Sequence, residues 1–390
     1  MAGRSGFILL AVLIARFGFG YQIQTVASVG PELRALFGLD YAGLGTLIGL
    51  YMASGIFVAV PLGLLARRFG EKPVLATGLV IMTCGATLSG LSEGPTGIGI
   101  GRAIAGIGAV AMVVIQGKIL ADWFPGRKFL MAISASVCAW PVGVGLGQLV
   151  QAPLARAYGW HWAFLSGALI SGLALILFLL SHRPAQNAVA VPRAFSLPSR
   201  WECALVIVGG CVWGSFNAAY MGFVAYVPSL LAERGASTTL TALVITLATW
   251  GNVPATLLGG TLAARYGGWP IFLTGMLAAA GGTAAIGLFD APLLWAFLFG
   301  VVGSLHPGVI IARGTLSARP ENRVVGLGMF YSTYYASGTV LPALCGKIGD
   351  LTNGPIGALL AAAAISLLAI PLYLAHRAMG HRSGIVPLGV

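Results

Sequence analysis

Charged side chains are scarce in this chain, and acidic ones are the scarcest. Of 390 residues, 22 are Lys or Arg and 10 are Asp or Glu, which together make up 8% of the chain, whereas 58% are hydrophobic. Soluble domains are about 25% charged and about 45–50% apolar. So few charges cannot cover a water-facing surface of this length. The composition excludes an ordinary soluble enzyme or binding domain and predicts an all-α integral membrane protein.

Motifs for catalysis and metal binding are missing as well. The five cysteines stand at no metal-ligand or redox spacing, and the apolar runs hold no paired carboxylates and no cluster of His, Cys and Asp. We therefore expect a protein that is not an enzyme and has no metal and no cofactor. The net charge of +12 comes mainly from residues between the apolar runs, so it requires no nucleic-acid partner.

The apolar runs divide the chain into two sets of six. A bilayer core is spanned by about 20 apolar residues, and the first run is too long for a signal-peptide core. We predict one six-helix bundle over residues 1–181, a cytoplasmic linker over 182–200 and a second bundle over 201–390. The twelve predicted spans are 6–29, 42–65, 73–91, 97–120, 129–152, 161–181, 202–228, 238–263, 270–289, 292–312, 324–345 and 355–375.

Basic residues between the spans are distributed unevenly. With the N-terminus placed inside, fifteen fall in segments on that side, and only Arg34, Arg156, Arg234 and Lys347 fall on the other. Cytoplasmic loops carry an excess of Lys and Arg. The pattern predicts a multi-pass protein of the cytoplasmic (inner) membrane with both termini in the cytoplasm.

The second half of the sequence repeats the first at an offset of 197 residues. Arg68 then falls on Arg265 and Gly70 on Gly267, in a match that continues without a gap over nearly fifty positions. Such parallel repeats are typical of two six-helix bundles related by a pseudo-twofold axis along the membrane normal.

Three short segments resemble motifs of the major facilitator superfamily. Residues 63–72 are similar to the loop signature between helices 2 and 3, residues 260–267 repeat it, and 102–108 are similar to the Arg-x-x-x-Gly-x-Gly element of helix 4. The resemblance implies a monomeric twelve-helix carrier whose helices 1, 4, 7 and 10 line a central cavity. It also implies coupling or gating roles for Arg68, Arg265 and Arg102.

The motifs also depart from the family pattern. Arg67 stands where the loop signature usually has an acid, and the second copy has Ala264, which puts the family's charge latch in doubt. Helix 5 carries Trp140-Pro141 rather than the Gly-Pro element of drug–proton antiporters, which weakens an efflux reading. Residues 28–34 resemble the end of helix 1 in cyanate- and nitrate-type anion carriers.

The charges inside the predicted spans are all basic. Arg16, Arg102, Lys118 and His306 lie within spans, whereas all ten carboxylates fall in loops or at span ends. A cation at membrane depth costs about 2.5–3.5 kcal/mol on insertion scales, so it is retained for a reason. A cationic interior favours an anionic passenger.

Arg16 is the sharpest candidate for binding that anion. It lies near the middle of the first span, and a guanidinium binds a carboxylate or similar oxyanion through two parallel hydrogen bonds. The alternative is a structural arginine bonded to carbonyls of a neighbouring helix. Tyr21 and Gln24 on the same span are further candidate contacts.

Coupling or gating has its own candidates. Arg102 and Gln116 lie about 40° apart on one helix face and about 21 Å apart along the axis, and Lys118 points elsewhere and is expected to snorkel. His306 is the one intramembrane group that titrates near neutral pH unaided, so it is a candidate for proton coupling, for substrate contact or for a purely structural role.

Aromatic residues form two stripes at helical spacing. Packing and a binding pocket are both open interpretations, because phenol groups at membrane depth need partners. Trp140 joins the set as a further candidate. The stripes are Trp213, Asn217 and Tyr220 in the seventh span and Tyr331, Tyr334 and Tyr335 in the eleventh.

The leading hypothesis is a secondary transporter that moves a small anion by alternating access, through anion exchange or proton symport. The anion is an organic carboxylate or an inorganic oxyanion, and the partners are protons or a counter-anion and the lipid bilayer. The alternative is a proton-coupled exporter of hydrophobic or cationic compounds, which the aromatic stripes favour.

Overall fold

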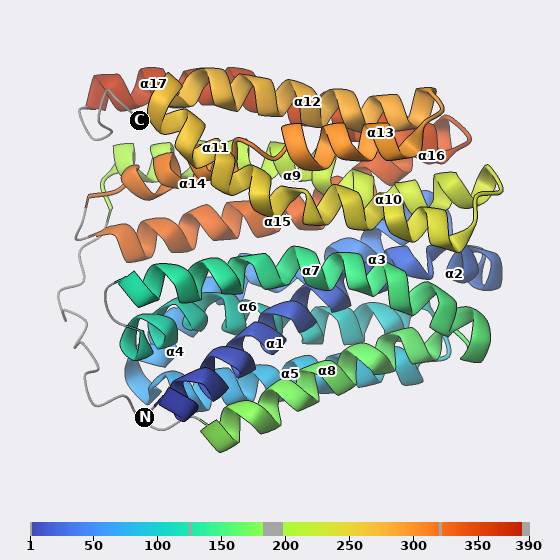
Figure 1. Ribbon diagram of the computed structural model, residues 1–390, viewed down its shortest axis with the longest axis horizontal. Helices are drawn as coiled ribbons and strands as arrows, with labels where there is room; N and C mark the ends of the chain where they lie inside the picture. The colour runs from blue at the N-terminus through green and yellow to red at the C-terminus, as the bar shows by residue number, and fades with distance from the viewer. Residues whose placement is uncertain (1, 125–126, 182–197, 320–321, 384–390) are drawn as a thin grey trace. The chain divides into compact units, whose positions relative to one another are not determined.

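The computed structural model describes residues 2–124, 127–181, 198–319 and 322–383, and every regular element in these ranges is a helix. The predicted linker over 182–200 lies almost entirely outside them. The elements are α1 (Ala2–Ser28), α2 (Gly30–Phe37), α3 (Tyr41–Ala53), α4 (Gly55–Phe69), α5 (Glu71–Leu91), α6 (Pro95–Trp123), α7 (Arg127–Tyr158), α8 (His161–Ser181), α9 (Arg200–Glu233), α10 (Thr238–Trp250), α11 (Asn252–Tyr266), α12 (Gly268–Leu288), α13 (Pro292–Phe297), the π-helix η1 (Leu298–Val302), α14 (Pro307–Leu316), α15 (Arg323–Leu351), α16 (Pro355–Leu367) and α17 (Ala369–Ser383) (Figure 1).

The predicted all-helical membrane fold is confirmed. Eleven helices or interrupted helix pairs in the described ranges are long and apolar enough to cross a bilayer. The 29-residue helix α15, which matches the predicted span over 324–345, is long enough to cross but is less apolar and is not among the eleven. Two helices separated by a short interruption, such as α3 and α4, count as one membrane span because the second follows directly on the first in the sequence.

The sequence repeat has a counterpart in local backbone geometry. The second span breaks at Ser54 and the eighth at Gly251, which are 197 residues apart and have similar helical backbone angles. Gly70 (φ 86°, ψ 164°) and Gly267 (φ 89°, ψ 155°) both end a helix in a conformation that L residues rarely adopt. The two halves therefore fold alike over this stretch.

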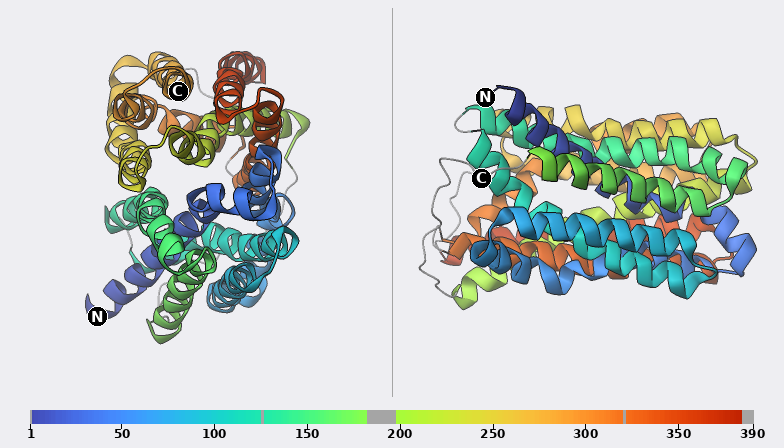
Figure 2. Two further views of the ribbon diagram at one scale, coloured as in Figure 1. Left: turned by 90° about the vertical axis from the view of Figure 1, so that its right-hand side faces the viewer. Right: turned by 90° about the horizontal axis from the view of Figure 1, so that it is seen from below.

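The chain forms two compact units, residues Met1–Leu33 with Leu50–Arg193 and residues Arg34–Gly49 with Ala194–Val390, here called unit 1 and unit 2. In unit 1, α1 packs on α7 and α8, while α5 packs on α6 and α8. A Cβ added at Gly20 would overlap the carbonyl oxygen of Trp140, so α1 and α7 touch backbone to backbone. The helices are seen nearly end-on in the left view of Figure 2, where α1 is tilted more than its neighbours.

Unit 2 is built around α9, which packs on α15, α16 and α17. Its first turn holds a buried carboxylate, Glu202, in a capping box with Ser199. Glu202 also accepts hydrogen bonds from the backbone N–H of Arg319 at 2.8 Å and from the Asn322 amide at 3.1 Å. This carboxylate thereby fixes the start of α9 to the chain that precedes α15.

Candidate functional site

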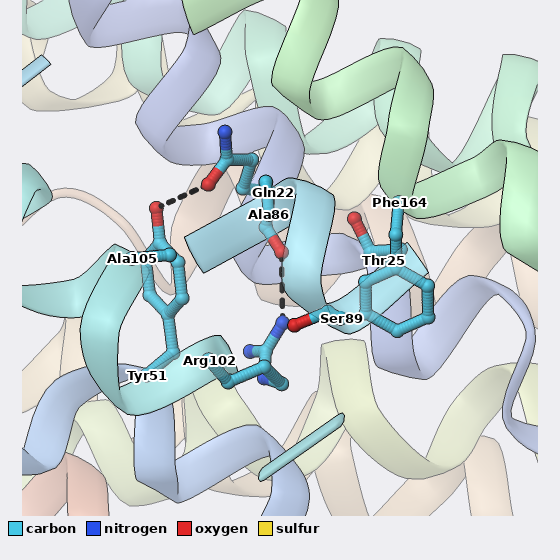
Figure 3. A pocket seen from close by; sticks show the side chains of 8 residues that line it. All are labelled: Gln22, Thr25, Tyr51, Ala86, Ser89, Arg102, Ala105 and Phe164. Carbon is cyan, nitrogen blue, oxygen red and sulfur yellow. Dashed lines mark hydrogen bonds between the residues drawn. The ribbon is translucent and has the colours of Figure 1, made fainter. Parts of the chain in front are cut away.

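Arg102 is the centre of a polar cluster in unit 1 (Figure 3). It is 2% exposed, and its Nη1 donates a hydrogen bond of 3.0 Å to the carbonyl oxygen of Gln22 on α1. Its guanidinium carbon lies 4.8 Å from the centre of the Tyr51 ring, and the Tyr51 hydroxyl donates to Gln22 Oε1. The arginine predicted for gating is thus held by the main chain of α1 and by an aromatic face.

A small cavity of about 10 Å³ adjoins this cluster. Thr25, Ser89 and Phe164 line it together with Arg102 and Gln22. A space of this size holds about one water molecule when polar partners surround it. It is too small for an organic substrate.

Arg16 on α1 contacts the same group of aromatic rings as Arg102 does. Its side chain is partly exposed, and its guanidinium carbon lies 5.3 Å from the centre of the Phe19 ring. Phe19 in turn contacts Trp140 at 6.1 Å and stacks on Tyr51 at 5.9 Å. Unit 1 therefore places a mid-helix cation against aromatic rings.

Tyr21 and Gln24 take part in contacts between helices. The Tyr21 hydroxyl lies 3.0 Å from Ser166 Oγ on α8, and Gln24 Nε2 donates to Gln148 Oε1 on α7 at 2.8 Å. Gln151 adds bonds from α7 to α1 through Tyr21 O and Thr25 Oγ1. These two glutamines were missed from the sequence, although polar residues three apart in an apolar helix are a usable signal.

Gln116 lies apart from this network. It is buried and accepts a hydrogen bond of 2.5 Å from Ser136 Oγ, which joins α6 to α7. The structure links Gln116 to α7 and not to Arg102. The side chain of Lys118 lies outside the described residues.

The two aromatic stripes of unit 2 meet at Trp213. Its ring lies 6.2 Å from that of Tyr334, and its carbonyl oxygen accepts a hydrogen bond of 2.8 Å from Asn217 Nδ2. Tyr334 contacts Tyr335 at 5.2 Å, and both Tyr331 and Tyr334 are partly exposed. Trp213, Tyr331 and Tyr334 are partly exposed, whereas Tyr335 is buried.

Tyr220 and His306 are buried in a second aromatic group. Tyr220 packs on Phe299 at 5.9 Å, while the His306 ring meets Phe216 edge-on at 4.4 Å and Phe272 at 5.8 Å. His306 is fully buried at the start of α14, and a Cβ added at Gly275 would overlap its Nδ1. This apolar enclosure favours the neutral, structural histidine that the sequence left open.

Arg68 and Arg265 lie at repeated positions. Both are exposed at the end of their helices, and each guanidinium carbon lies 5.2 Å from the ring of the next residue, Phe69 or Tyr266. The side chains of Arg67 and Ala264 lie outside the described residues.

The described carboxylates lie away from the middle of the long helices, where two arginines stand. Arg16 is near the middle of α1 and Arg102 is the eighth residue of α6. Every carboxylate among the described residues lies in a connection, in the short α2 or in the first or last turn of a longer helix. The same residues form no group of His, Cys, Asp and Glu that could hold a metal ion.

Comparison with known proteins agrees with this architecture. The sequence profile of the Major Facilitator Superfamily matches residues 9–342. The chain belongs to this superfamily. Carriers of this superfamily are secondary transporters.

Individual relatives are distant. The 4-hydroxybenzoate transporter PcaK of Pseudomonas aeruginosa is 25% identical in an alignment of 297 residues that covers 66% of this chain and 66% of PcaK. Protein spinster homolog 3 of Danio rerio is 30% identical in an alignment of 188 residues that covers 46% of this chain and 38% of that protein. The chain therefore spans less than two thirds of the length of these curated relatives.

Solved structures share the fold. The crystal structure of a bacterial homologue of the human lysosomal transporter Spinster, in an inward-facing and unoccupied conformation, aligns with a TM-score of 0.76 over 96% of this chain and 97% of that one. Its sequence identity of 13% supports the fold alone.

Proposed function

We propose that this superfamily member carries a small organic carboxylate across the cytoplasmic membrane, with both termini in the cytoplasm. It works as a monomer, by anion exchange or proton symport. The observation that carries the proposal is the position of Arg16, a cation in the middle of α1 whose side chain is partly exposed although its Nε and Nη1 are buried, in a chain whose described carboxylates all lie at helix ends or in connections. A guanidinium at this depth provides the bidentate donor that a carboxylate needs.

The surroundings of Arg16 favour an organic over an inorganic anion. Phe19, which is buried, lies beneath the guanidinium, and Trp140, the next ring along, is partly exposed, so an apolar body finds aromatic surface on Trp140 beside the charge. A ring-bearing carboxylate uses both features, whereas nitrate uses only the first. The name of PcaK, a 4-hydroxybenzoate transporter, supports the same choice.

Titration calorimetry on the purified chain tests this proposal, with 4-hydroxybenzoate, benzoate and nitrate as probes. We expect both aromatic acids to bind more tightly than nitrate. Arg16→Gln should lower the affinity about tenfold or more, because a charge-assisted pair is lost, and Arg16→Lys should recover part of it. Arg156→Gln, at an exposed position near the end of α7, is the control and should bind as wild type does. Equal affinity of Arg16→Gln and wild type refutes the role of Arg16.

The aromatic surface of unit 2 supports the second candidate, an exporter of hydrophobic or cationic compounds. Trp213, Tyr331 and Tyr334 are partly exposed, and aromatic faces attract lipophilic cations. Competition of transport by tetraphenylphosphonium, with no response to any carboxylate, selects this function over the first.

A further inference from the structure

Two interrupted spans of unit 2 meet at their breaks. The eighth span breaks at Gly251, between α10 and α11, and the tenth breaks over residues 303–306, between η1 and α14. Both α10 and α11 pack on η1, and α11 also packs on α14 (Figure 1). We propose that oxygen atoms of Asn252, Thr256 and Ser304, here called the junction site, bind a sodium ion that holds the two spans together.

A proline follows each break and removes a helical donor there. Pro254 lies four residues after Trp250, and Pro307 lies four residues after Gly303. Proline has no N–H for the carbonyl four residues before it. In unit 1, Val110 stands at the position of Pro307 in the repeat, and α6 continues through it without a break. The break in the tenth span therefore belongs to unit 2, and main-chain oxygens at such breaks are the groups that coordinate Na⁺ in membrane carriers.

Oxygen atoms from both spans converge at the junction. Thr256 Oγ1 lies 3.1 Å from Asn252 Oδ1 and 3.2 Å from the carbonyl oxygen of Ser304. A threonine hydroxyl has one proton, so it donates to only one of these two acceptors at a time. The carbonyl oxygen of Leu305 lies directly against Gly259 on α11, because a Cβ added at Gly259 would overlap it. The junction therefore gathers oxygens from two spans with one threonine proton between two of them, which favours a cation.

The hydroxyl of Ser304 is the observation that points to a ligand. Ser304 is 1% exposed, and its Oγ is buried with no hydrogen-bond partner among the described residues. A buried polar atom is costly unless protein, water or an ion pairs with it. The same residue supplies the carbonyl that Thr256 contacts, so both of its oxygens belong to this junction. A cation bound here pairs with the Ser304 hydroxyl.

The spacing and the charge of these oxygens select sodium among the common cations. Two ligands at right angles around an ion lie about 1.4 times the ion–oxygen distance apart, so separations of 3.1 and 3.2 Å fit an ion–oxygen distance of about 2.2–2.3 Å, between those of Mg²⁺ and Ca²⁺. The ligands are neutral hydroxyl, amide and carbonyl groups, whereas divalent ions are bound with carboxylates. A small monovalent ion fits both conditions. These ligands include none of the His, Cys, Asp and Glu residues on which the expectation of no metal was based.

The junction site is independent of the proposed carboxylate. It lies entirely in unit 2, whereas Arg16 lies in unit 1. Its ligands come from α11 and from the break before α14, so the ion binds only while the two spans are in contact. A ligand that binds one arrangement stabilises that arrangement. Sodium should therefore make unit 2 more resistant to unfolding.

Equilibrium binding of radioactive sodium to the purified full chain tests the proposal, with choline chloride keeping the ionic strength constant. We expect saturable binding of a single ion, which unlabelled Na⁺ displaces and K⁺ displaces about tenfold less well or worse. Thr256→Val and Ser304→Ala should each lower the affinity about tenfold, because each removes one ligand oxygen. Thr261→Val, at an exposed position on the same helix, is the matched control and should bind as wild type does.

A variant that gains affinity separates the site from loss of folding. Asn252→Asp replaces a neutral ligand with a charged one and should bind sodium about tenfold more tightly, which a misfolded chain cannot do. Sodium should also raise the apparent melting temperature of wild type and Thr261→Val by about 3 °C or more over choline, and that of Thr256→Val by less. The proposal is overturned if Na⁺, K⁺ and choline act alike, which leaves water as the occupant. It is also overturned if Thr256→Val and Ser304→Ala bind sodium as wild type does, or if Thr261→Val loses as much affinity as they do.

Discussion

The rings of Phe19 and Tyr51 stack with their centres 5.9 Å apart, and each also contacts an arginine. Arg16 lies over Phe19 and Arg102 over Tyr51. The two cations that the sequence placed on separate spans are therefore joined through one aromatic pair in unit 1. They differ in exposure, because Arg102 is buried as a whole, whereas Arg16 is partly exposed although its Nε and Nη1 are buried. This difference predicts different consequences for their replacement.

Replacing Arg102 should cost stability first. Arg102→Ala leaves the contacts to Gln22 O and Tyr51 unmade and opens a void beside the existing cavity, which should lower the free energy of unfolding by about 2–4 kcal/mol. Thermal unfolding in detergent measures this effect, with the exposed Arg156→Gln as the control. A variant that melts as wild type does but fails to transport would instead assign Arg102 to gating.

The backbone contact between α1 and α7 leaves no room for a methyl group at Gly20. Gly20→Ala places a methyl group on the carbonyl oxygen of Trp140, so we expect a loss of about 1–3 kcal/mol. Gly117→Ala, where an added Cβ meets nothing within 4 Å, should instead gain up to about 1 kcal/mol from helix propensity. Apparent melting temperatures that shift in the same direction in both variants would contradict this account of the contact.

The sequence predicted the fold well because a bilayer imposes length and composition on every span. Helix breaks and turns also recur at matching positions of the two halves. Gly70 and Gly267, for example, both have a positive φ, a backbone conformation that favours glycine. The neighbours of each side chain were harder to predict. Where a helix is apolar on all sides, periodicity does not say which face meets which helix. Gln24 therefore looked like a cavity residue, while the structure pairs it with Gln148.

One local motif at the start of α9 can be recognised from the sequence. Ser199 and Glu202 have the spacing of a capping box, which predicts the start of α9. The contacts of Glu202 with Arg319 and Asn322 depend on how distant segments pack, so no local pattern could have revealed them. The same holds for Asp350 and the start of α3.

His306 should not carry the coupling proton. Its ring is fully buried between Phe216 and Phe272, where a charged imidazolium has no solvation. His306→Phe should keep the fold and leave the dependence of uptake on external pH unchanged, because phenyl replaces imidazole in an aromatic site. Proteoliposome uptake over a pH series checks this. A flattened pH profile in His306→Phe, with normal thermal stability, would restore the coupling role.

Trp140 should set the preference for ring-bearing substrates. It contacts Phe19, which lies under Arg16, so it can lie beside the body of a bound acid while Arg16 holds the carboxylate. Trp140→Ala should lower the affinity for 4-hydroxybenzoate about tenfold, since an aromatic contact contributes about 0.5–1.5 kcal/mol beyond its buried area. The affinity for acetate should change little. Trp162→Ala, at an α8 position that is 48% exposed, is the matched control. Competitive uptake of the two acids measures the ratio of their affinities directly. If both acids weaken together, Trp140 supports the fold of α7 and does not touch the substrate.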